Sequence, residues 1–352
     1  MDPAAALTLA DLESGAPGIW RYGAALPRIP AADRVTLGEA QTPLVPAELD
    51  GMRMLLKLEH LQPTGSYKDR GAALLISALR SFGARECLED SSGNAASAMA
   101  AYGAAAGILC NVLAPAANSP AKLAQTRAHG ARVTLVDGDR EAVEREVQRL
   151  AEQSPDVRYV GHNWHPLFTA GVSTIGIELV EQLGGEPPDS VIMPVGYGNL
   201  LLGVAGGMEA LRRSGQISRL PRLYAVQSES FPAIATAFAA GREGVAKLPG
   251  TKTVAEGIEC VRPVRGRAVL AALRGSDGAA IMVPETEIAA ATDTLVGHGH
   301  YVEPTSAVAL AGLRRLLATG ALDRGGRHVV VLTGSGQKTP ALIERLLRDA
   351  RS

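Results

Sequence analysis

The feature that most constrains this chain is the alternation, from about residue 68 onward, between helix-length amphipathic segments and short apolar runs. The helical pattern covers 68–83, 94–107, 119–130 and 140–153. The strand-like runs, rich in β-branched residues, are 86–90, 108–114, 132–136, 191–195, 222–227, 279–283 and 328–333. Alternation of this kind predicts an α/β fold with two open, mostly parallel twisted sheets that are flanked by helices.

The length of the chain also suggests how it divides. With 352 residues it is long enough for two domains. We expect 85–170 to form a smaller α/β domain, and 1–84 with 171–352 to form a larger one whose N-terminal part is shared with the smaller. In open sheets of this type, ligands bind beside the carboxyl ends of strands, so the loops that follow these ends are the places to look for function.

The composition argues against several classes of partner. The formal net charge is −1 and basic residues are scattered, so neither nucleic acid nor a membrane is expected as a partner. The longest apolar stretch, 95–117, is too interrupted to span a bilayer, and the acidic N-terminus lacks the basic start of a secretory signal. Cys87, Cys110 and Cys260 follow no metal or redox spacing, which favours buried thiols, no metal site and a cytoplasmic location.

Three loops at predicted strand ends carry unusual sequences. Gly196-Tyr197-Gly198-Asn199-Leu200 lies between a strand-like run and a helix, an order that presents backbone N–H groups to a phosphate. Ser91-Ser92-Gly93-Asn94 opens the alanine-rich helix, where hydroxyl, amide and N–H groups suit a carboxylate or a ring hydroxyl. Thr333-Gly334-Ser335-Gly336-Gln337-Lys338 ends the last strand-like run. An ordinary tight turn or helix cap remains the alternative for each loop.

Lys68 adds a cation in an electrostatically unfavourable place. It lies within 63–71 (PTGSYKDRG), where a helix is predicted to begin. A cation there opposes the helix dipole at a cost of up to about 1 kcal/mol, whereas a neutral amine does not and can act as a nucleophile. A surface lysine is the ordinary alternative. A Schiff-base lysine, a phosphate loop and an anion site at a second helix N-terminus together describe a pocket for pyridoxal phosphate.

The same residues resemble a known family. Residues 61–71 (LQPTGSYKDRG) are similar to the lysine signature of fold-type-II pyridoxal-phosphate enzymes, the tryptophan synthase beta-like superfamily, and most closely to their threonine synthase-like branch. The family's asparagine loop, phosphate cradle, a YVEPTSA-like block and ring-nitrogen motif are similar, in this order, to 91–94, 196–200, 301–307 and 333–338. The resemblance spans about 37–345.

The resemblance implies pyridoxal 5'-phosphate in a cleft between the larger and the smaller domain. It implies that Lys68 bonds to the cofactor and moves protons at the substrate carbons, and that Asn94 binds the ring 3′-oxygen. The substrate carboxylate would contact Ser91, Ser92 and Gly93, and the cofactor phosphate would contact the N–H groups of Gly196, Tyr197, Gly198, Asn199 and Leu200. Thr333 would face the pyridine nitrogen, and this neutral partner suits elimination or replacement better than transamination. A homodimer is the family's usual state.

Two positions depart from the pattern of threonine synthases. Phe168 stands where that branch has an arginine for the phosphate of O-phosphohomoserine, and Tyr197 replaces an asparagine of the phosphate cradle. Losing a charge-assisted contact to a phosphate costs about 1.5–3 kcal/mol, so we expect a substrate with a less anionic side chain. Lys122 remains where the branch has a lysine, either as an anion contact or as a solvated helix residue.

Three further residues stay open between functional and structural roles. His162 and His165 flank Trp164, so both are weighed for a substrate-lining role and His165 is the predicted substrate-binding residue, with a structural loop histidine as the alternative. Neither histidine is assigned as a catalytic base. Glu303 either orders the active-site wall or caps the helix that follows Pro304.

We therefore expect a pyridoxal-phosphate-dependent lyase or transferase that eliminates or replaces a substituent on the side chain of a small-molecule amino acid. A genuine threonine synthase and a serine/threonine dehydratase-type ammonia-lyase are the alternatives. A dinucleotide-dependent oxidoreductase is a remote alternative, because GYGNLLLG does not match G-x-G-x-x-G and no acidic residue follows at the expected distance. A catalytically silent binding protein would not need Lys68, Asn94 and Thr333 together.

Overall fold

The computed structural model describes residues 8–12, 15–117, 120–138, 140–154 and 157–351. Its contacts divide the chain into two compact units. The first unit contains Asp11–Gln41 and Gln62–Thr174, and the second contains Thr42–Leu61 and Ile175–Ser352 together with residues 8–10. The domain limits expected at 85 and 170 stay a prediction. Among the described residues, no helix combines the length and the apolar character that a membrane span requires.

The first unit is built on a parallel sheet of four strands, with the order β5-β4-β3-β6. The strands are β3 (Glu86–Glu89), β4 (Leu109–Pro115), β5 (Arg132–Val136) and β6 (Arg158–Tyr159). The helices of this unit are α1 (Lys68–Ser81), α2 (Asn94–Ala106), α3 (Pro120–Ala128), α4 (Arg140–Gln153) and α5 (Pro166–Val172), with short 3-10 helices at Gly18–Ala25 and Ala31–Asp33. From β3 the chain adds β4 and β5 on one side and then returns to add β6 on the other. The strand order therefore reverses at β3, where such sheets bind ligands.

Small residues let helix α2 lie close to the sheet of the first unit. In α2, which is mostly alanine and glycine, a Cβ on Gly103 would lie 2.5 Å from the Sγ of Cys110. Cys87 and Cys110 lie on neighbouring strands with their sulfur atoms 3.3 Å apart, and both are buried free thiols. The expectation of buried, unbridged cysteines is confirmed, and Cys260 is also a buried free thiol.

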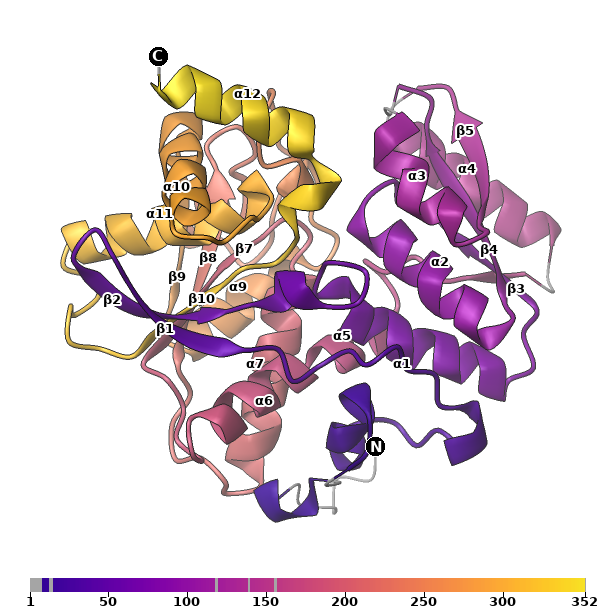
Figure 1. Cartoon of the computed structure of the whole chain (residues 1–352), viewed down its shortest axis with the longest axis horizontal. Coiled ribbons are helices and arrows are strands. Elements are labelled where there is room, and N and C mark those ends of the chain that lie inside the picture. The colour runs from indigo at the N-terminus through magenta and orange to yellow at the C-terminus, as the bar shows by residue number, and fades with distance from the viewer. Residues whose placement is uncertain (1–7, 13–14, 118–119, 139, 155–156, 352) are drawn as a thin grey trace. The chain divides into compact units, whose positions relative to one another are not determined.

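The second unit contains a six-stranded sheet with the order β1-β2-β10-β7-β8-β9. Its strands are β1 (Leu44–Leu49), β2 (Met52–Lys57), β7 (Ser190–Pro194), β8 (Arg222–Ser228), β9 (Ala279–Val283) and β10 (His328–Val331). Only the β1–β2 pair is antiparallel among these strands. Figure 1 shows this hairpin beside β10. Here the strand order reverses between β7 and β10.

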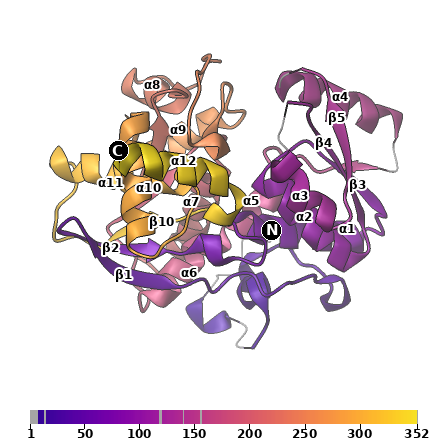
Figure 2. The same ribbon diagram turned by 45° about the horizontal axis from the view of Figure 1, so that its top comes forward.

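The helices of the second unit cover its sheet. They are α6 (Thr174–Gln182), which begins at the last residue of the first unit, α7 (Asn199–Arg213), α8 (Ala233–Ala239), α9 (Gly266–Gly275), α10 (Glu285–Gly297), α11 (Pro304–Ala318) and α12 (Pro340–Arg351), with 3-10 turns at Glu59–Leu61, Glu256–Ile258 and Gly336–Lys338. Helices α10, α11 and α12 lie together in Figure 2. The expected α/β fold with two mostly parallel sheets is confirmed.

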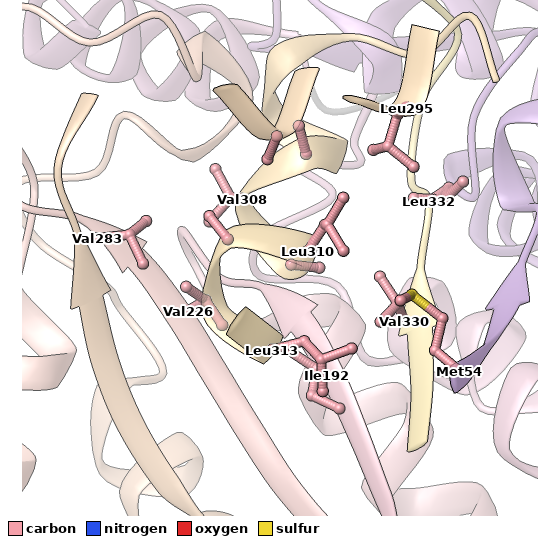
Figure 3. Close-up of a cluster of buried hydrophobic side chains, with 14 of the residues drawn as sticks. Met54, Ile192, Val226, Val283, Leu295, Val308, Leu310, Leu313, Val330 and Leu332 are labelled. Atoms are coloured by element: carbon pink, nitrogen blue, oxygen red, sulfur yellow. The ribbon is translucent and has the colours of Figure 1, made fainter. Parts of the chain in front are cut away.

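The core of the second unit lies between its sheet and α11. Figure 3 shows Val308, Leu310 and Leu313 of α11 among apolar side chains that the strands contribute, including Ile192 and Val330. These five side chains are fully buried. Burial of each contributes about 1.5–3 kcal/mol, so this packing fixes the strands whose carboxyl ends carry two of the predicted loops.

Candidate active site

Lys68 is the first residue of α1 and lies within the first unit. The turn before it is held by Asp69, whose carboxylate accepts hydrogen bonds from the N–H of Thr64 (2.7 Å) and from the Thr64 hydroxyl. The Lys68 Nζ lies 4.7 Å from the centroid of the Tyr67 ring and 5.6 Å from that of Phe168. Within the described part of the chain, the amine contacts these rings without a hydrogen bond or an ion pair. Its surroundings therefore leave the amine available for chemistry.

Phe168 forms an apolar wall near this amine. It lies on α5, is fully buried, and packs against α1 so closely that a Cβ on Gly71 would be 2.6 Å from its ring. The ring of His162 meets it edge-on, with centroids 5.6 Å apart. An aromatic ring thus lies near Lys68, in the position where the resemblance leads one to expect a guanidinium.

Two other predicted substrate-binding residues of this unit, His165 and Lys122, lie at different helices. His165 caps α5, because its Nδ1 accepts a hydrogen bond from the N–H of Leu167 at 3.3 Å. Trp164 is exposed, and Lys122 is half-buried on α3. The structure gives His165 a structural task as a cap, while the substrate-binding roles of His165 and Lys122 stay predictions.

The loop Ser91–Asn94 lies at the carboxyl end of β3, where the strand order reverses. Helix α2 begins at Asn94 with Gly93 as its N-cap, and no side chain caps it. Ser91 instead accepts a hydrogen bond from the N–H of Gly93 at 3.3 Å. Ser91, Ser92, Gly93 and Asn94 are all half-buried. An uncapped helix N-terminus with two hydroxyls beside it can bind a carboxylate.

Behind this loop lies a cluster of buried ionisable groups. Glu89 ends β3 and is fully buried, and its Oε1 is 2.8 Å from the Nδ1 of His162, just beyond β6. The carboxylate of Asp90 pairs with the guanidinium of Arg140 at 2.6 Å. Ligand atoms of Glu89, Asp90 and His162 all lie within 4.8 Å of one another. Burial raises the pKa of Glu89 to about 7 and lowers the pKa of His162 well below its usual value.

The second unit brings two of the predicted loops together. Strands β7 and β10 are neighbours, so the loop 196–200 and Thr333 follow the carboxyl ends of adjacent strands at the reversal point of this sheet. Helix α7 begins at Asn199, and its N-cap is Gly198, with a φ of +98° and no side-chain cap. A Cβ on Gly198 would overlap Val269 as well as strain the backbone. The loop therefore places backbone N–H groups at a helix N-terminus, a suitable place for a phosphate.

Thr333 lies in a network of neutral hydrogen-bonding groups. Its hydroxyl is 3.1 Å from that of Ser306, which accepts a hydrogen bond from the N–H of Gly334 at 2.9 Å. Glu303 occupies the N-cap position of α11, and its carboxylate lies where a Cβ on Gly334 would be. The side chain of Glu303 makes no capping hydrogen bond to α11, and its role in an active-site wall stays a prediction.

Comparison with known proteins identifies the group that such residues bind. Residues 35–334 match the family described as pyridoxal-phosphate dependent enzyme. The chain belongs to this family. Its cofactor is pyridoxal phosphate, and its fold is that of fold-type-II enzymes, as the resemblance implied. Each unit by itself has groups that fit pyridoxal phosphate: the first has the Lys68 amine, and the second has a glycine turn at a helix N-terminus in 196–200 and the neutral hydroxyl of Thr333. The roles of these residues in binding the cofactor stay predictions.

Individual relatives carry several activities. Threonine synthase from Methanocaldococcus jannaschii is 33% identical over 330 residues, which cover 92% of this chain and 81% of that protein. The solved structure of a threonine deaminase from T.th. is 30% identical, with a TM-score of 0.73, and the match covers 94% of this chain and 98% of that one. Maize serine racemase is 23% identical, with a TM-score of 0.72 and coverage of 88% and 92%, and shares the fold. The family is thus established, while the names of these relatives indicate more than one reaction.

Neither Glu89 nor its contact with His162 was predicted from the sequence. Residues 86–90 were predicted only as a strand, and His162 was weighed only as a structural or substrate-lining loop residue. The sequence does show a charged residue, Glu89, near the carboxyl end of a strand-like run and just before the loop 91–94, for which a binding role is predicted. Its partner could not be found in this way, since 73 residues separate Glu89 from His162.

Proposed function

We propose that this pyridoxal-phosphate enzyme is a lyase that eliminates or replaces a substituent on the side chain of an amino acid. The substrate we favour lacks the phosphate of O-phosphohomoserine. The observation that carries this proposal is Phe168, fully buried against Gly71 with its ring 5.6 Å from the Lys68 amine. A buried aromatic side chain offers no charge-assisted hydrogen bond to a phosphate dianion, whereas an arginine does.

The cofactor supplies an electron sink for the bond-breaking step. In our proposal, Lys68 takes the proton from the substrate's α-carbon, and its aromatic neighbours exclude water from the amine. Ser91, Ser92 and Gly93 hold the substrate carboxylate at the N-terminus of α2, while Asn94 orients the cofactor ring. N–H groups of 196–200 hold the phosphate. The Thr333–Ser306 hydroxyl pair provides a neutral partner for the ring nitrogen, which favours elimination over transamination.

Two alternatives have specific support. The relatives named threonine synthase, at 33% identity, favour formation of threonine from O-phosphohomoserine. The structural relative named threonine deaminase, at 30% identity, favours an ammonia-lyase acting on a hydroxy amino acid. We favour the ammonia-lyase over the threonine synthase for two reasons. Phe168 offers no charge-assisted hydrogen bond to a phosphate, and the buried acidic residues Glu89 and Asp90 directly precede the loop 91–94.

The test begins with the purified protein and pyridoxal phosphate. We expect visible absorption that is retained through gel filtration by the wild-type protein and lost in Lys68→Ala. The protein is then assayed for 2-oxo acid, ammonia and threonine with serine, threonine, O-phosphohomoserine and acylated homoserines. Release of a 2-oxo acid and ammonia supports a lyase. Rapid formation of threonine from O-phosphohomoserine would instead establish a threonine synthase and show that Phe168 does not exclude the phosphate.

A further inference from the structure

Glu89 stands out among the ionisable groups of the first unit because it has a free oxygen in a closed environment. Glu89 is fully buried. Its Oε1 lies 2.8 Å from the Nδ1 of His162, and its Oε2 has no hydrogen-bond partner. A buried carboxyl oxygen without a partner costs about 1–3 kcal/mol, so folding does not favour this arrangement. The free oxygen therefore points to a task that involves a ligand.

The position of Glu89 in the fold indicates which ligand. It is the last residue of β3, and two residues later the chain enters the loop Ser91–Asn94 proposed to hold the substrate carboxylate. Burial is the main cause of the raised pKa of Glu89 and the lowered pKa of His162, and Lys68 adds a smaller lowering effect to each. Phe168 contacts both the His162 ring and the Lys68 amine. Glu89 is thus linked to the proposed catalytic lysine through His162 and Phe168.

The charges around the cluster argue for a proton site and against a cation site. Asp90, the second carboxylate, is already paired with Arg140. The facing groups are Lys68 from α1, Arg140 from α4, Tyr159 from β6 and His162 from the loop after β6. Arg140 is a cation at any pH near neutrality, and it opposes a metal ion at the same place. A carboxyl group beside a neutral imidazole can instead hold and release a proton.

We propose that Glu89 is the acid that protonates the leaving group on the substrate's side chain, and that His162 positions its carboxyl. This inference rests on the proposed lyase function and narrows its substrate class. A leaving hydroxide needs a proton, whereas a phosphate or a halide leaves without one. The substrate class is therefore an amino acid with a hydroxyl on its side chain.

The step balances in atoms and charge. Lys68, as a neutral amine, takes the proton from the α-carbon, and the carbon–oxygen bond of the side chain breaks. The protonated Glu89 gives its proton to the departing oxygen, which leaves as water. Lys68 is then positively charged and Glu89 negatively charged, and transfer of one proton from the first to the second restores both. The raised pKa of Glu89, about 7, keeps a supply of the protonated form near neutral pH.

A leaving-group comparison tests this assignment. Wild type, Glu89→Gln and Glu86→Gln are loaded with pyridoxal phosphate and assayed for 2-oxo acid from serine, threonine and β-chloroalanine. Glu86 is a matched control, because it is at the other end of the same strand and its half-buried carboxylate binds Asn111 at 2.9 Å. We expect Glu89→Gln to lose at least about 100-fold of its rate with the hydroxy amino acids and to keep its rate with β-chloroalanine within about threefold. Glu86→Gln should match wild type with all three.

The outcomes separate this inference from the proposed function. If wild type turns over β-chloroalanine but neither hydroxy amino acid, the elimination chemistry stands and the role of Glu89 is wrong. Equal losses with both kinds of leaving group, or no loss with either, would also overturn that role. If wild type eliminates nothing from any of the three, the proposed lyase function itself fails, and the inference fails with it.

The protonation state of Glu89 can be read without any activity. Infrared difference spectra between wild type and Glu89→Gln, recorded on the protein without cofactor, should show the carbonyl band of a protonated carboxyl at pH 6 and not at pH 8. Absence of this band at pH 6 would contradict the proposal. In His162→Gln, we expect the pH at which this band disappears to shift while a thermal unfolding scan confirms that the variant is folded. An unchanged pH would show that His162 does not position the carboxyl.

Discussion

Lys57 shows how much the surroundings of two lysines in this chain can differ. It lies on β2 with a fully buried side chain, its ammonium pairs with Glu178, and it donates hydrogen bonds to the Thr42 carbonyl and the Gln182 Oε1, each at 2.8 Å. Lys68, by contrast, contacts only ring faces among the described residues. The Lys57 ammonium thus has three oxygen partners, which suits a structural role. Reaction with an aldehyde requires the second kind of surroundings.

The Lys57–Glu178 pair makes a clear prediction about stability. Lys57→Met leaves a carboxylate buried without its ammonium, and we expect a loss of about 3–5 kcal/mol in the free energy of unfolding. Adding Glu178→Leu should recover most of that loss, because neither charge then remains buried. Urea unfolding of wild type, the single variant and the double variant measures both values. A single variant within about 1 kcal/mol of wild type would show that the pair contributes little to the stability of the folded state.

Glu89 links stability to pH. Burial raises its pKa from 4.5 to about 7, so between these values the folded chain keeps a proton that the unfolded chain releases. Stability from this group therefore falls as pH rises from about 4.5 to 7, by about 3 kcal/mol in total. Burial lowers the pKa of His162, so stability from this group rises with pH below its usual pKa. His162 is present in both wild type and Glu89→Gln. We expect the unfolding midpoint of Glu89→Gln, relative to wild type, to increase between pH 5 and pH 8. A pH-independent difference would contradict this.

Most of the strands in the described part of the chain, and four helices of the first unit, could be predicted from the sequence. Helices α1, α2, α3 and α4 and strands β3, β4, β5, β7, β8, β9 and β10 all fall on predicted segments. The β1–β2 hairpin was missed, although Asp50 and Gly51 form a two-residue turn with φ values of +52° and +68° and Asp-Gly is a recognised signal for it. Strand β6 has two residues, too few to show a period. Whether so short a segment forms a strand depends on the strands beside it rather than on its own sequence pattern.

Helix α7 offers a matched pair of glycines for testing the phosphate loop. Gly198 precedes the helix with a φ of +98° and no room for a Cβ, whereas a Cβ on Gly206, within the helix, would meet nothing within 4 Å. We expect Gly198→Ala to weaken binding of pyridoxal phosphate about tenfold or more, since the backbone strain costs about 1–2 kcal/mol. Gly206→Ala should instead raise stability by about 0.5–1 kcal/mol and leave binding unchanged. Titration of the visible absorption measures both affinities, and urea unfolding measures the stability. Equal affinities would remove 196–200 from the proposed phosphate site.

At the scale of the whole chain, the parts of the candidate site that follow the carboxyl ends of strands could be predicted from the sequence. Loops after β3, β7 and β10 were found because each follows an apolar run, and the reversal of strand order in each sheet explains why these ends matter. The pairing of Glu89 with His162 was not predictable, because it depends on β6 lying beside β3. The resemblance supplied residue roles along the chain, and the fold supplied the contacts that no sequence pattern marks.

Cofactor binding should stabilise the whole chain through mass action. A ligand that binds only the folded state adds about 2.7 kcal/mol at a concentration of about 100 times its Kd. We therefore expect the unfolding midpoint of wild type to rise steadily with pyridoxal phosphate. In Lys68→Ala the rise should be smaller and should require more cofactor, because the N–H groups of 196–200 can still hold the phosphate but no covalent bond forms. Pyridoxal without the phosphate serves as a control and should shift wild type less than the phosphorylated cofactor does. Identical curves for the two proteins would show that Lys68 does not bond to the cofactor.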